Sequence, residues 1–278
     1  MKKTRLDTLL VDKGLFDSQE QACRAILAGQ VSAADCLLDK PGTLVDPLLE
    51  ISVAASPAYV SRGADKLIKA LDAFGINPIG RVVLDAGAST GGFTDVLLSR
   101  GAQTVIAVDV GYGQLAWKLR QDPRVAVFER TNIRAVKAAD LPAVPDLVVA
   151  DLSFISLAKV APNLISLSAP AADFVFLIKP QFEAAKGTVG KGGIIREAQS
   201  HIDILTDVAF ALEKAGLRLT GLAYSPITGA DGNIEFLAHL RKELEIINKR
   251  SEIKNRDLEL LIKRIVIDAH KALERNIK

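Results

Sequence analysis

Cysteine is scarce in this sequence, and long apolar runs are missing. The two cysteines among 278 residues, Cys23 and Cys36, match neither a metal-site spacing nor a disulfide framework. We therefore expect a reducing compartment, the cytoplasm, and interpret both side chains as small buried hydrophobic groups. No apolar run approaches the ~18 residues of a membrane span. The N-terminal segment Leu6–Asp12 is too short and too charged for a signal peptide, so we expect no membrane partner.

A strong net charge is also lacking. The formal net charge is +2 at pH 7, which is weak support for a nucleic-acid partner. Residues 1–50 carry six basic and eight acidic side chains, a net of −2, whereas residues 241–278 carry eleven basic and seven acidic ones, a net of +4. Any RNA-binding surface must therefore be a local stripe of charge.

Composition and length fit a globular protein with one large domain and a smaller one. Hydrophobic residues make up 49% and charged residues 24%, which is usual for such proteins and allows a large core. Residues 1–55 show two helical patterns that end at Gly14 and Gly29 and are followed by short strands. After this first domain we expect a linker over 56–62, a second domain over 63–245 and a C-terminal helical extension over 246–278.

Strand and helix patterns alternate through the second domain, which argues for a parallel sheet with helices on both faces. The expected strands are Val82–Asp85, Thr104–Asp109, Val125–Phe128, Leu147–Asp151 and Phe174–Ile178, with Leu217–Ser225 and Ile234–His239 as a closing pair. The expected helices are Val60–Phe74, Phe93–Arg100, Leu157–Leu167 and Gln199–Ala215. A tail helix over Lys254–Ile277 would pack one apolar face on the main domain; that face consists of Leu258, Leu261, Ile265, Ala269 and Leu273.

A glycine-rich turn follows the first of these strands. Its spacing is Asp85-x-Gly87-x-x-x-Gly91-Gly92, which differs from the Gly-x-Gly-x-x-Gly of dinucleotide-binding proteins. Glycine lets the backbone approach a ligand, and the N-terminus of the following helix offers free N–H donors. The Asp85 carboxylate suits a ligand with an ammonium group and would repel a diphosphate, so the turn favours S-adenosylmethionine.

Other segments extend this interpretation. Asp109 ends the second strand and can accept hydrogen bonds from both hydroxyls of a cofactor ribose, and Asn132 follows the third strand, where the adenine edge would lie. The Lys186–Gly193 loop suits closure over a phosphate backbone, or is a flexible connector. Arg62 and Arg134 are further candidates for RNA contacts. The three histidines are far apart in the sequence and show no ligand spacing.

Several motifs together resemble the TlyA family, the S4-domain ribosomal RNA 2′-O-methyltransferases with an FtsJ/RrmJ-like catalytic domain, historically named haemolysins. They are Leu84–Thr94, Asp109–Leu115, Glu129–Asn132, Asp151–Ser156, Lys179–Glu183, Ser225–Ile227 and Gly232–Glu235. The resemblance covers roughly residues 4–245. It implies a Rossmann-like α/β methyltransferase sheet, mostly parallel with one antiparallel strand, and a small N-terminal α+β S4-like domain. It also implies S-adenosylmethionine as cofactor, a cytidine ribose as acceptor, and ribosomal RNA or a ribosomal subunit as partner.

The N-terminal segment departs from the S4 pattern in one respect. The module often has a basic residue after the serine that starts its second helix, and here Gln19 follows Ser18. Together with the net acidic charge, this predicts a weaker RNA contact than usual. The alternative interpretation is a small dimerisation or docking domain, and the oligomeric state stays open.

The resemblance also implies the residues of the site. The catalytic tetrad would be Lys66, Asp151, Lys179 and Glu235. The cofactor would be held by Asp85, Gly87, Ser89, Gly91, Gly92, Phe93, Thr94, Asp109, Val110, Asn132, Ile133 and Asp151.

Elementary chemistry supports these residue types. A methyl sulfonium needs only an aligned attacking oxygen, so no metal is required, but a ribose 2′-OH is a poor nucleophile at neutral pH. A lysine side chain can act as the base when a nearby cation and burial lower its pKa. We expect Lys179 to accept the proton, with Lys66 as its cationic neighbour. Asp151 and Glu235 would hold the two lysines through charge-assisted hydrogen bonds.

Three other functions compete with this hypothesis. The first is a non-enzymatic RNA-binding or ribosome-assembly factor, which the intact tetrad argues against. The second is a membrane-lytic toxin, which the lack of a span and of a strongly amphipathic surface segment argues against. The third is a base methyltransferase, whose usual aromatic clamp after the fourth strand is replaced here by Asp151-Leu152-Ser153-Phe154.

Overall fold

The computed structural model describes residues 3–27, 29–33, 36–53, 58–184, 193–229, 232–242 and 255–273. It divides into two compact units, Met1–Ala58 and Tyr59–Lys278. The first unit contains two helices and five short strands in the described residues. These elements are β1 (Thr4–Arg5), α1 (Leu6–Asp12), α2 (Gln19–Leu27), β2 (Val31–Ala33), β3 (Cys36–Leu37), β4 (Leu44–Val45) and β5 (Ser52–Val53).

The first unit has a small apolar core of its own. Leu6 and Leu10 of α1 pack with Ala22 and Ile26 of α2. Strand β1 pairs with β4, and β2 lies between β3 and β5, in two antiparallel sheets. The expected order of two helices followed by short strands is therefore present, apart from β1, whose two residues are too few to give a strand pattern.

A buried carboxylate supports this unit. Asp7 accepts hydrogen bonds from the Arg5 guanidinium, at 2.6 and 3.1 Å, and from the Thr8 N–H at 2.8 Å. The Arg5 hydrogen bond outweighs burial and lowers the pKa of Asp7 to about 2. The Cys23 sulfur lies 3.6 Å from the same carboxylate and is only partly buried, and Cys36 is exposed. The interpretation of both cysteines as buried hydrophobic groups is therefore wrong, because Cys23 contacts a charged group and Cys36 lies in a short strand of a small sheet.

The second unit is built on a seven-stranded sheet. Its strands have the order β11-β12-β10-β9-β6-β7-β8, and β12 alone runs in the direction opposite to the other six. This confirms the predicted sheet, mostly parallel with one antiparallel strand. The strands are β6 (Val82–Ala86), β7 (Thr104–Val108), β8 (Val125–Phe128), β9 (Leu147–Ala150), β10 (Asp173–Ile178), β11 (Leu217–Tyr224) and β12 (Phe236–Lys242).

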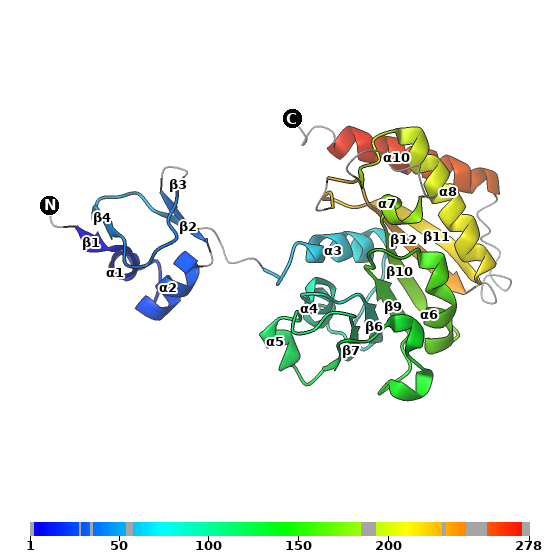
Figure 1. The fold of residues 1–278 in the computed structure, drawn as a ribbon, viewed down its shortest axis with the longest axis horizontal. Helices are drawn as coiled ribbons and strands as arrows, with labels where there is room; N and C mark the ends of the chain where they lie inside the picture. Colours follow the sequence, from blue (N-terminus) through cyan, green and yellow to red (C-terminus); the bar gives the residue numbers. More distant parts are fainter. Residues whose placement is uncertain are drawn as a thin grey trace. The chain divides into compact units, whose positions relative to one another are not determined.

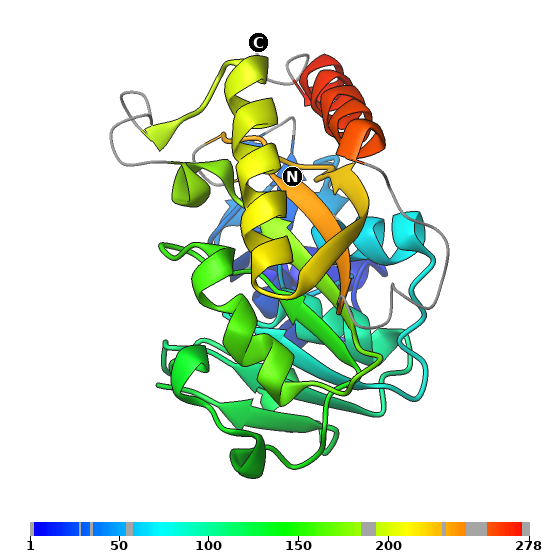
Figure 2. The same ribbon diagram turned by 90° about the vertical axis from the view of Figure 1, so that its right-hand side faces the viewer.

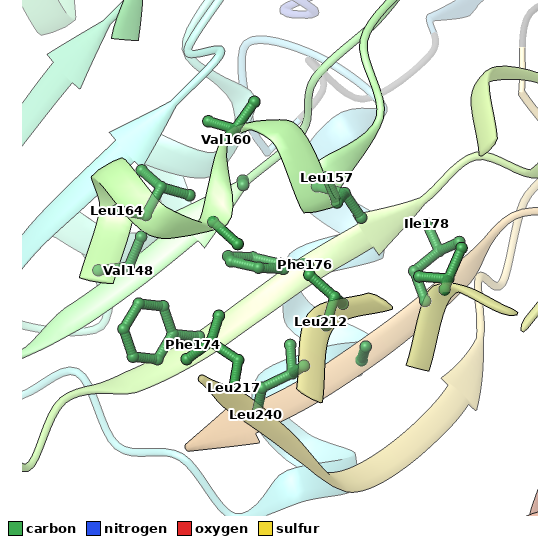
Figure 3. Close-up of a cluster of buried hydrophobic side chains, with 14 of the residues drawn as sticks. Val148, Leu157, Val160, Leu164, Phe174, Phe176, Ile178, Leu212, Leu217 and Leu240 are labelled. Atoms are coloured by element: carbon green, nitrogen blue, oxygen red, sulfur yellow. The ribbon is translucent and has the colours of Figure 1, made fainter. Parts of the chain in front are cut away.

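Helices cover both faces of this sheet because successive strand residues point to opposite sides. In β10, Phe174 and Phe176 pack among α6, α8 and α10, whereas Val175 and Leu177 pack with α3 and α4. Figure 3 shows the first of these clusters, and Figures 1 and 2 show α8 and α10 side by side. The helices are α3 (Gly63–Phe74), α4 (Gly92–Ser99), α5 (Trp117–Arg120), α6 (Ala161–Leu167), α7 (Pro180–Glu183), α8 (Ala198–Lys214) and α10 (Asn255–Leu273).

Two helices differ from their sequence patterns. The predicted helix Leu157–Leu167 is divided into a 3-10 turn, Leu157–Lys159, and α6. Pro162 lies in the first turn of α6, where its missing N–H costs nothing, so the helix begins there. In α10 the predicted Ala269 and Leu273 are buried, but the other buried residues are Ile262 and Val266, one position beyond the predicted Leu261 and Ile265, which are only partly buried. The shift arises because α10 packs on both α8 and β11.

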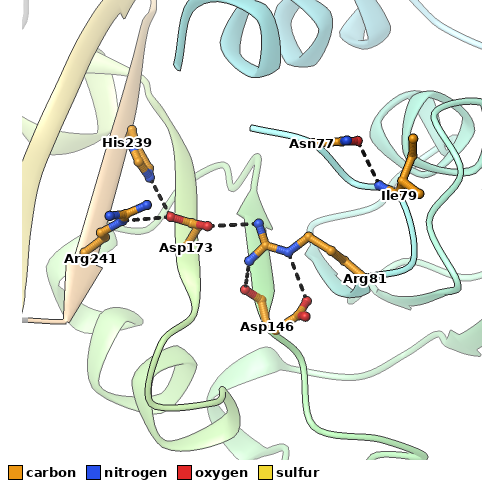
Figure 4. A network of polar contacts seen from close by, with 7 residues as sticks. All are labelled: Asn77, Ile79, Arg81, Asp146, Asp173, His239 and Arg241. Atoms are coloured by element: carbon orange, nitrogen blue, oxygen red, sulfur yellow. Dashed lines mark hydrogen bonds and ion pairs between the residues drawn. The ribbon is translucent and has the colours of Figure 1, made fainter. Parts of the chain in front are cut away.

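A polar network ties the strands at the end of the sheet where β10 begins (Figure 4). Asp173 accepts hydrogen bonds from Arg81, His239 and Arg241, each at 2.9 Å. Partial burial acts to raise the pKa of Asp173, but these three donors outweigh it and hold the pKa below its ordinary value. Because Lys179 follows the other end of β10, this network supports the fold and lies away from the predicted site.

Candidate active site

The predicted site residues gather where neighbouring strands of the sheet end. β6 and β9 are adjacent and parallel, and the chain leaves β6 toward α4 on one face and β9 toward α6 on the other. Such a point of divergence forms the ligand crevice of open α/β sheets. Asp85 is the next-to-last residue of β6, Asp151 directly follows β9, and Lys179 directly follows β10.

The glycine turn after β6 fits closely against the segment after β9. Gly87 has a φ of 87°, and a Cβ atom there would overlap the Asp151 carbonyl oxygen. Gly91, with a φ of 97°, caps the N-terminus of α4, where no side chain caps the first turn. The backbone N–H groups at this end of α4 therefore remain suited to a ligand.

Asp85 is the most deeply buried acid of the pocket. Its Oδ2 accepts a hydrogen bond from the Thr94 hydroxyl at 2.7 Å, whereas its buried Oδ1 has no partner among the described residues. Burial raises the pKa of Asp85 to about 7; the Thr94 hydrogen bond opposes this rise, and the Asp151 charge adds to it. A buried carboxylate oxygen without a partner fits the ammonium group of S-adenosylmethionine.

Asp109 is held in place by two backbone segments. Its Oδ2 accepts the Ser89 N–H at 2.8 Å and its Oδ1 accepts the Gly111 N–H at 2.7 Å. Each oxygen keeps a second lone pair, which is what binding of two ribose hydroxyls requires. Asn132 accepts the Arg134 N–H through Oδ1 at 3.0 Å, which leaves its amide group as a donor. Their ligand roles stay predictions.

The four predicted tetrad residues form two ion pairs. Lys66 comes from α3, and its Nζ lies 2.5 Å from Oε2 of Glu235, which precedes β12. Lys179 Nζ lies 2.6 Å from Asp151 Oδ1. The first pair is the more buried, since Lys66 is 9% and Glu235 2% exposed.

The two ion pairs belong to one charge cluster. Burial raises the pKa of Glu235, while the charges of Lys66 and then Lys179 lower it and the charge of Asp151 raises it further. Asp151 also contributes to the raised pKa of Asp85. The structure therefore brings all four predicted residues together beside the glycine turn.

Sequence reasoning missed the contacts that hold the Asp151 segment. Lys179 donates a hydrogen bond to the Ser153 hydroxyl at 2.9 Å, and the Leu157 N–H donates to Glu183 at 2.8 Å. The rings of Phe154 and Phe182 lie 4.8 Å apart. These contacts join two motifs noted in the sequence, Asp151–Ser156 and Lys179–Glu183. Ser153, a polar residue two positions after Asp151, was the sequence signal for them.

Other predictions have mixed outcomes. Arg62 and Arg134 are exposed, and residues 186–192 of the predicted phosphate loop lie outside the described residues.

His201 Nδ1 and His270 Nε2 lie 2.9 Å apart, so two histidines that seemed unrelated in the sequence are in direct contact. They show how little sequence separation says about contacts between α8 and α10.

Comparison with known proteins agrees with this geometry. The model of the FtsJ-like methyltransferase family matches residues 59–242. The chain belongs to this family. Its resemblance to TlyA proteins is also confirmed, because the Mycobacterium tuberculosis 16S/23S rRNA (cytidine-2′-O)-methyltransferase TlyA is 48% identical over 246 residues, 88% of this chain and 92% of the relative.

Two further relatives carry a different name. Hemolysin A of Brachyspira hyodysenteriae is 41% identical over 236 residues, 84% of this chain and 98% of the relative. A solved structure from Streptococcus thermophilus, described as a candidate hemolysin, is 42% identical with a TM-score of 0.74, and the match covers 99% of this chain and 98% of that one. Among the described residues of this FtsJ-like protein, no helix is long and apolar enough to cross a membrane.

The family and the fold establish that this protein is a methyltransferase. Its methyl donor is S-adenosylmethionine, as the sequence predicted, and the residues present fit that molecule. The Asp85 oxygen without a partner can bind the ammonium group, and the Gly87 turn leaves room for close backbone approach.

Proposed function

We propose that this FtsJ-like methyltransferase methylates the 2′-oxygen of a cytidine ribose in ribosomal RNA. The observation that carries the proposal is the pair of lysine–carboxylate ion pairs, Lys66–Glu235 and Lys179–Asp151, beside the cofactor turn. The names of the TlyA relatives support the same substrate. Ribosomal RNA also makes the cytoplasm the expected place of action.

S-adenosylmethionine supplies a methyl group already activated on a sulfonium. Asp85 would bind its ammonium group, Asp109 its ribose hydroxyls, and Asn132 its adenine edge, with Val110 and Ile133 beside the ring. This leaves the protein two tasks, which are to align the 2′-oxygen and to remove its proton.

Lys179 is the proposed proton acceptor. Its ion pair with Asp151 is the more open of the two, because the side-chain exposure of Asp151 is 22%, against 3% for Glu235. A group that receives a proton from RNA must be reachable by the ribose. Lys66, held by Glu235, would be its cationic neighbour in the site.

The first unit is proposed to bind RNA as an S4-like module. Its support is the arrangement of two helices and small sheets around their own core. Exposed Lys13 and Lys40 are candidates for phosphate contacts. Replacing both with alanine should weaken RNA binding and reduce its salt dependence while leaving cofactor binding unchanged.

Transfer of a tritiated methyl group to ribosomal RNA tests the proposal. The RNA would be offered both free and as ribosomal subunits, and the labelled nucleoside identified by mass spectrometry. We expect 2′-O-methylcytidine in the presence of the protein. A methyl group on a base, or no transfer to either form of the RNA, would show that the assigned substrate is wrong.

Lysine variants test the mechanism separately. Lys179→Ala should reduce turnover by about 10²–10⁴-fold yet bind S-adenosylhomocysteine with nearly normal affinity. Lys69, on the same helix as Lys66 but exposed, offers the matched control, and Lys69→Ala should retain full turnover. Near-normal turnover of Lys179→Ala would remove Lys179 from the proposed role.

A further inference from the structure

Ser153 makes an aligned hydrogen bond with the Lys179 amine. The Lys179 Nζ donates to Ser153 Oγ at 2.9 Å. Asp151 Oδ1 lies nearer, at 2.6 Å, but outside hydrogen-bond alignment. Within the described part of the chain, the charge of Lys179 is therefore paired by Asp151, while the orientation of its N–H groups is set by Ser153.

One aligned hydrogen bond is enough to orient an amine. The three non-carbon positions on the nitrogen turn together about the Cε–Nζ bond, so fixing one of them fixes the other two. When a lysine is neutral, one of these positions is the lone pair that receives a proton. The hydroxyl of Ser153 can accept from Lys179 in both protonation states, so it holds this orientation throughout proton transfer.

The segment that carries Ser153 is held at both ends. The Asp151 N–H donates to the Ala86 carbonyl of β6 at 3.0 Å, and the Leu157 N–H donates to Glu183 at 2.8 Å. Between these anchors the rings of Phe154 and Phe182 are in contact. These links join the segment after β9 to α7, which directly follows Lys179.

The backbone of this segment is strained. Phe154 has a φ of 63°, in the left-handed region that a bulky residue rarely adopts. Strain of this kind persists only where the surrounding structure fixes the backbone, and it is concentrated at functional sites. Phe154 directly follows Ser153, whose side chain is exposed and hydrogen-bonds Lys179.

We infer that Ser153 is a positioning residue of the methyl-transfer site. Its hydroxyl orients the Lys179 amine so that the lone pair faces the incoming ribose 2′-OH. This inference rests on the proposed role of Lys179 as proton acceptor. Because Ser153 would act by orienting the Lys179 amine, its loss should lower kcat. The binding of RNA and of cofactor should change little.

A pair of variants with the same shape provides the test. Ser153→Thr keeps the hydroxyl, and Ser153→Val replaces it with a methyl group on an equally branched side chain. Ser153→Val should lower kcat by about 10–100-fold, with the KM for RNA and the affinity for S-adenosylhomocysteine within about twofold of the unchanged enzyme. Ser153→Thr should restore most of kcat. Ser166→Ala, at an exposed serine of α6, controls for loss of a serine hydroxyl elsewhere.

The outcomes separate this inference from the proposed function. Equal kcat for the Thr and Val variants would overturn the role of Ser153, as would a raised KM with unchanged kcat. If Lys179→Ala is inactive while Ser153→Val turns over normally, only the role of Ser153 fails. If Lys179→Ala itself turns over normally, the proposed mechanism fails first. Thermal melts of each variant identify any loss of kcat that comes from unfolding.

Discussion

Lys66 Nζ lies 2.5 Å from Glu235 Oε2, although 169 residues separate them in the sequence. Both side chains are nearly buried, so each charge depends on the other for compensation. The pair joins α3 to the start of β12 at the point where the sheet meets the cofactor turn. It therefore contributes to folding as well as to the proposed chemistry, and the two contributions can be separated.

Single and double replacements of this pair should differ in stability but agree in activity. Lys66→Met or Glu235→Gln leaves one buried charge without a partner, which should lower the free energy of unfolding by about 3–5 kcal/mol. The double variant Lys66→Met/Glu235→Leu removes both charges and should recover much of that loss. Urea unfolding measures the stability, and methyl transfer should stay low in all three. A double variant less stable than both single variants would contradict this account of the pair.

Cofactor affinity should depend on pH through Asp85. Its pKa of about 7 means that the carboxyl group is largely protonated below pH 7, and a neutral acid attracts an ammonium group less strongly. Affinity for S-adenosylhomocysteine should therefore fall as the pH decreases from 8 to 6, approaching about tenfold per pH unit well below the pKa. Calorimetry at several pH values checks this.

Asp85→Asn provides the control for that dependence. The amide cannot ionise, so the variant should bind weakly and with nearly the same affinity across the range. The raised pKa of Asp85 also affects the stability of the unliganded protein. Between about pH 4 and 7 the folded protein keeps a proton on Asp85 that the unfolded chain has lost, so the protein should lose stability as the pH increases over this range. An unchanged affinity between pH 6 and 8 in the native protein would show that Asp85 does not bind the ammonium group.

Local patterns predicted the parts of the fold and site that depend on neighbouring residues. Strand–turn–helix signals gave β6, the glycine turn and α4, and so placed Asp85 correctly. Asp151 and Lys179 could be placed because each directly follows an apolar strand. These residues lie at one edge of the sheet because parallel strands end on the same side. The strand pattern of the sequence therefore predicts that they are near one another.

Contacts between distant segments could not be predicted in this way. The pairing of Lys66 with Glu235 depended on the family resemblance, because no local pattern brings a residue of α3 beside one that precedes β12. The hydrogen bond from Lys179 to Ser153 connects the segments that follow β10 and β9, which the sheet places side by side. The sequence shows a polar residue two positions after Asp151, but residue types and spacing do not show its partner in this contact, nor that of Lys66.

A methyl group at Gly87 should disrupt the site more than one at Gly80. Both glycines have positive φ, 87° and 72°, so alanine is strained at either position by about 1–2 kcal/mol. At Gly87 the added Cβ also overlaps the Asp151 carbonyl oxygen, whereas at Gly80 it meets nothing within 4 Å. Gly87→Ala should therefore abolish cofactor binding and turnover, and Gly80→Ala should retain both. Similar activities in the two variants would show that close packing at Gly87 is not required.

Acid should weaken the contact between α8 and α10 through His201. Burial, and then the charge of His270, lowers the pKa of His201 to about 4. A histidine with a lowered pKa stays neutral in the folded protein and gains a proton on unfolding. Its contribution to stability is therefore present above about pH 6.5 and is lost as the pH falls toward 4. Thermal melts between pH 7.5 and 4.5 should show this loss, and His201→Phe, which cannot be protonated, should lose less stability over the same range. Equal losses in both proteins would place the acid sensitivity elsewhere in the chain.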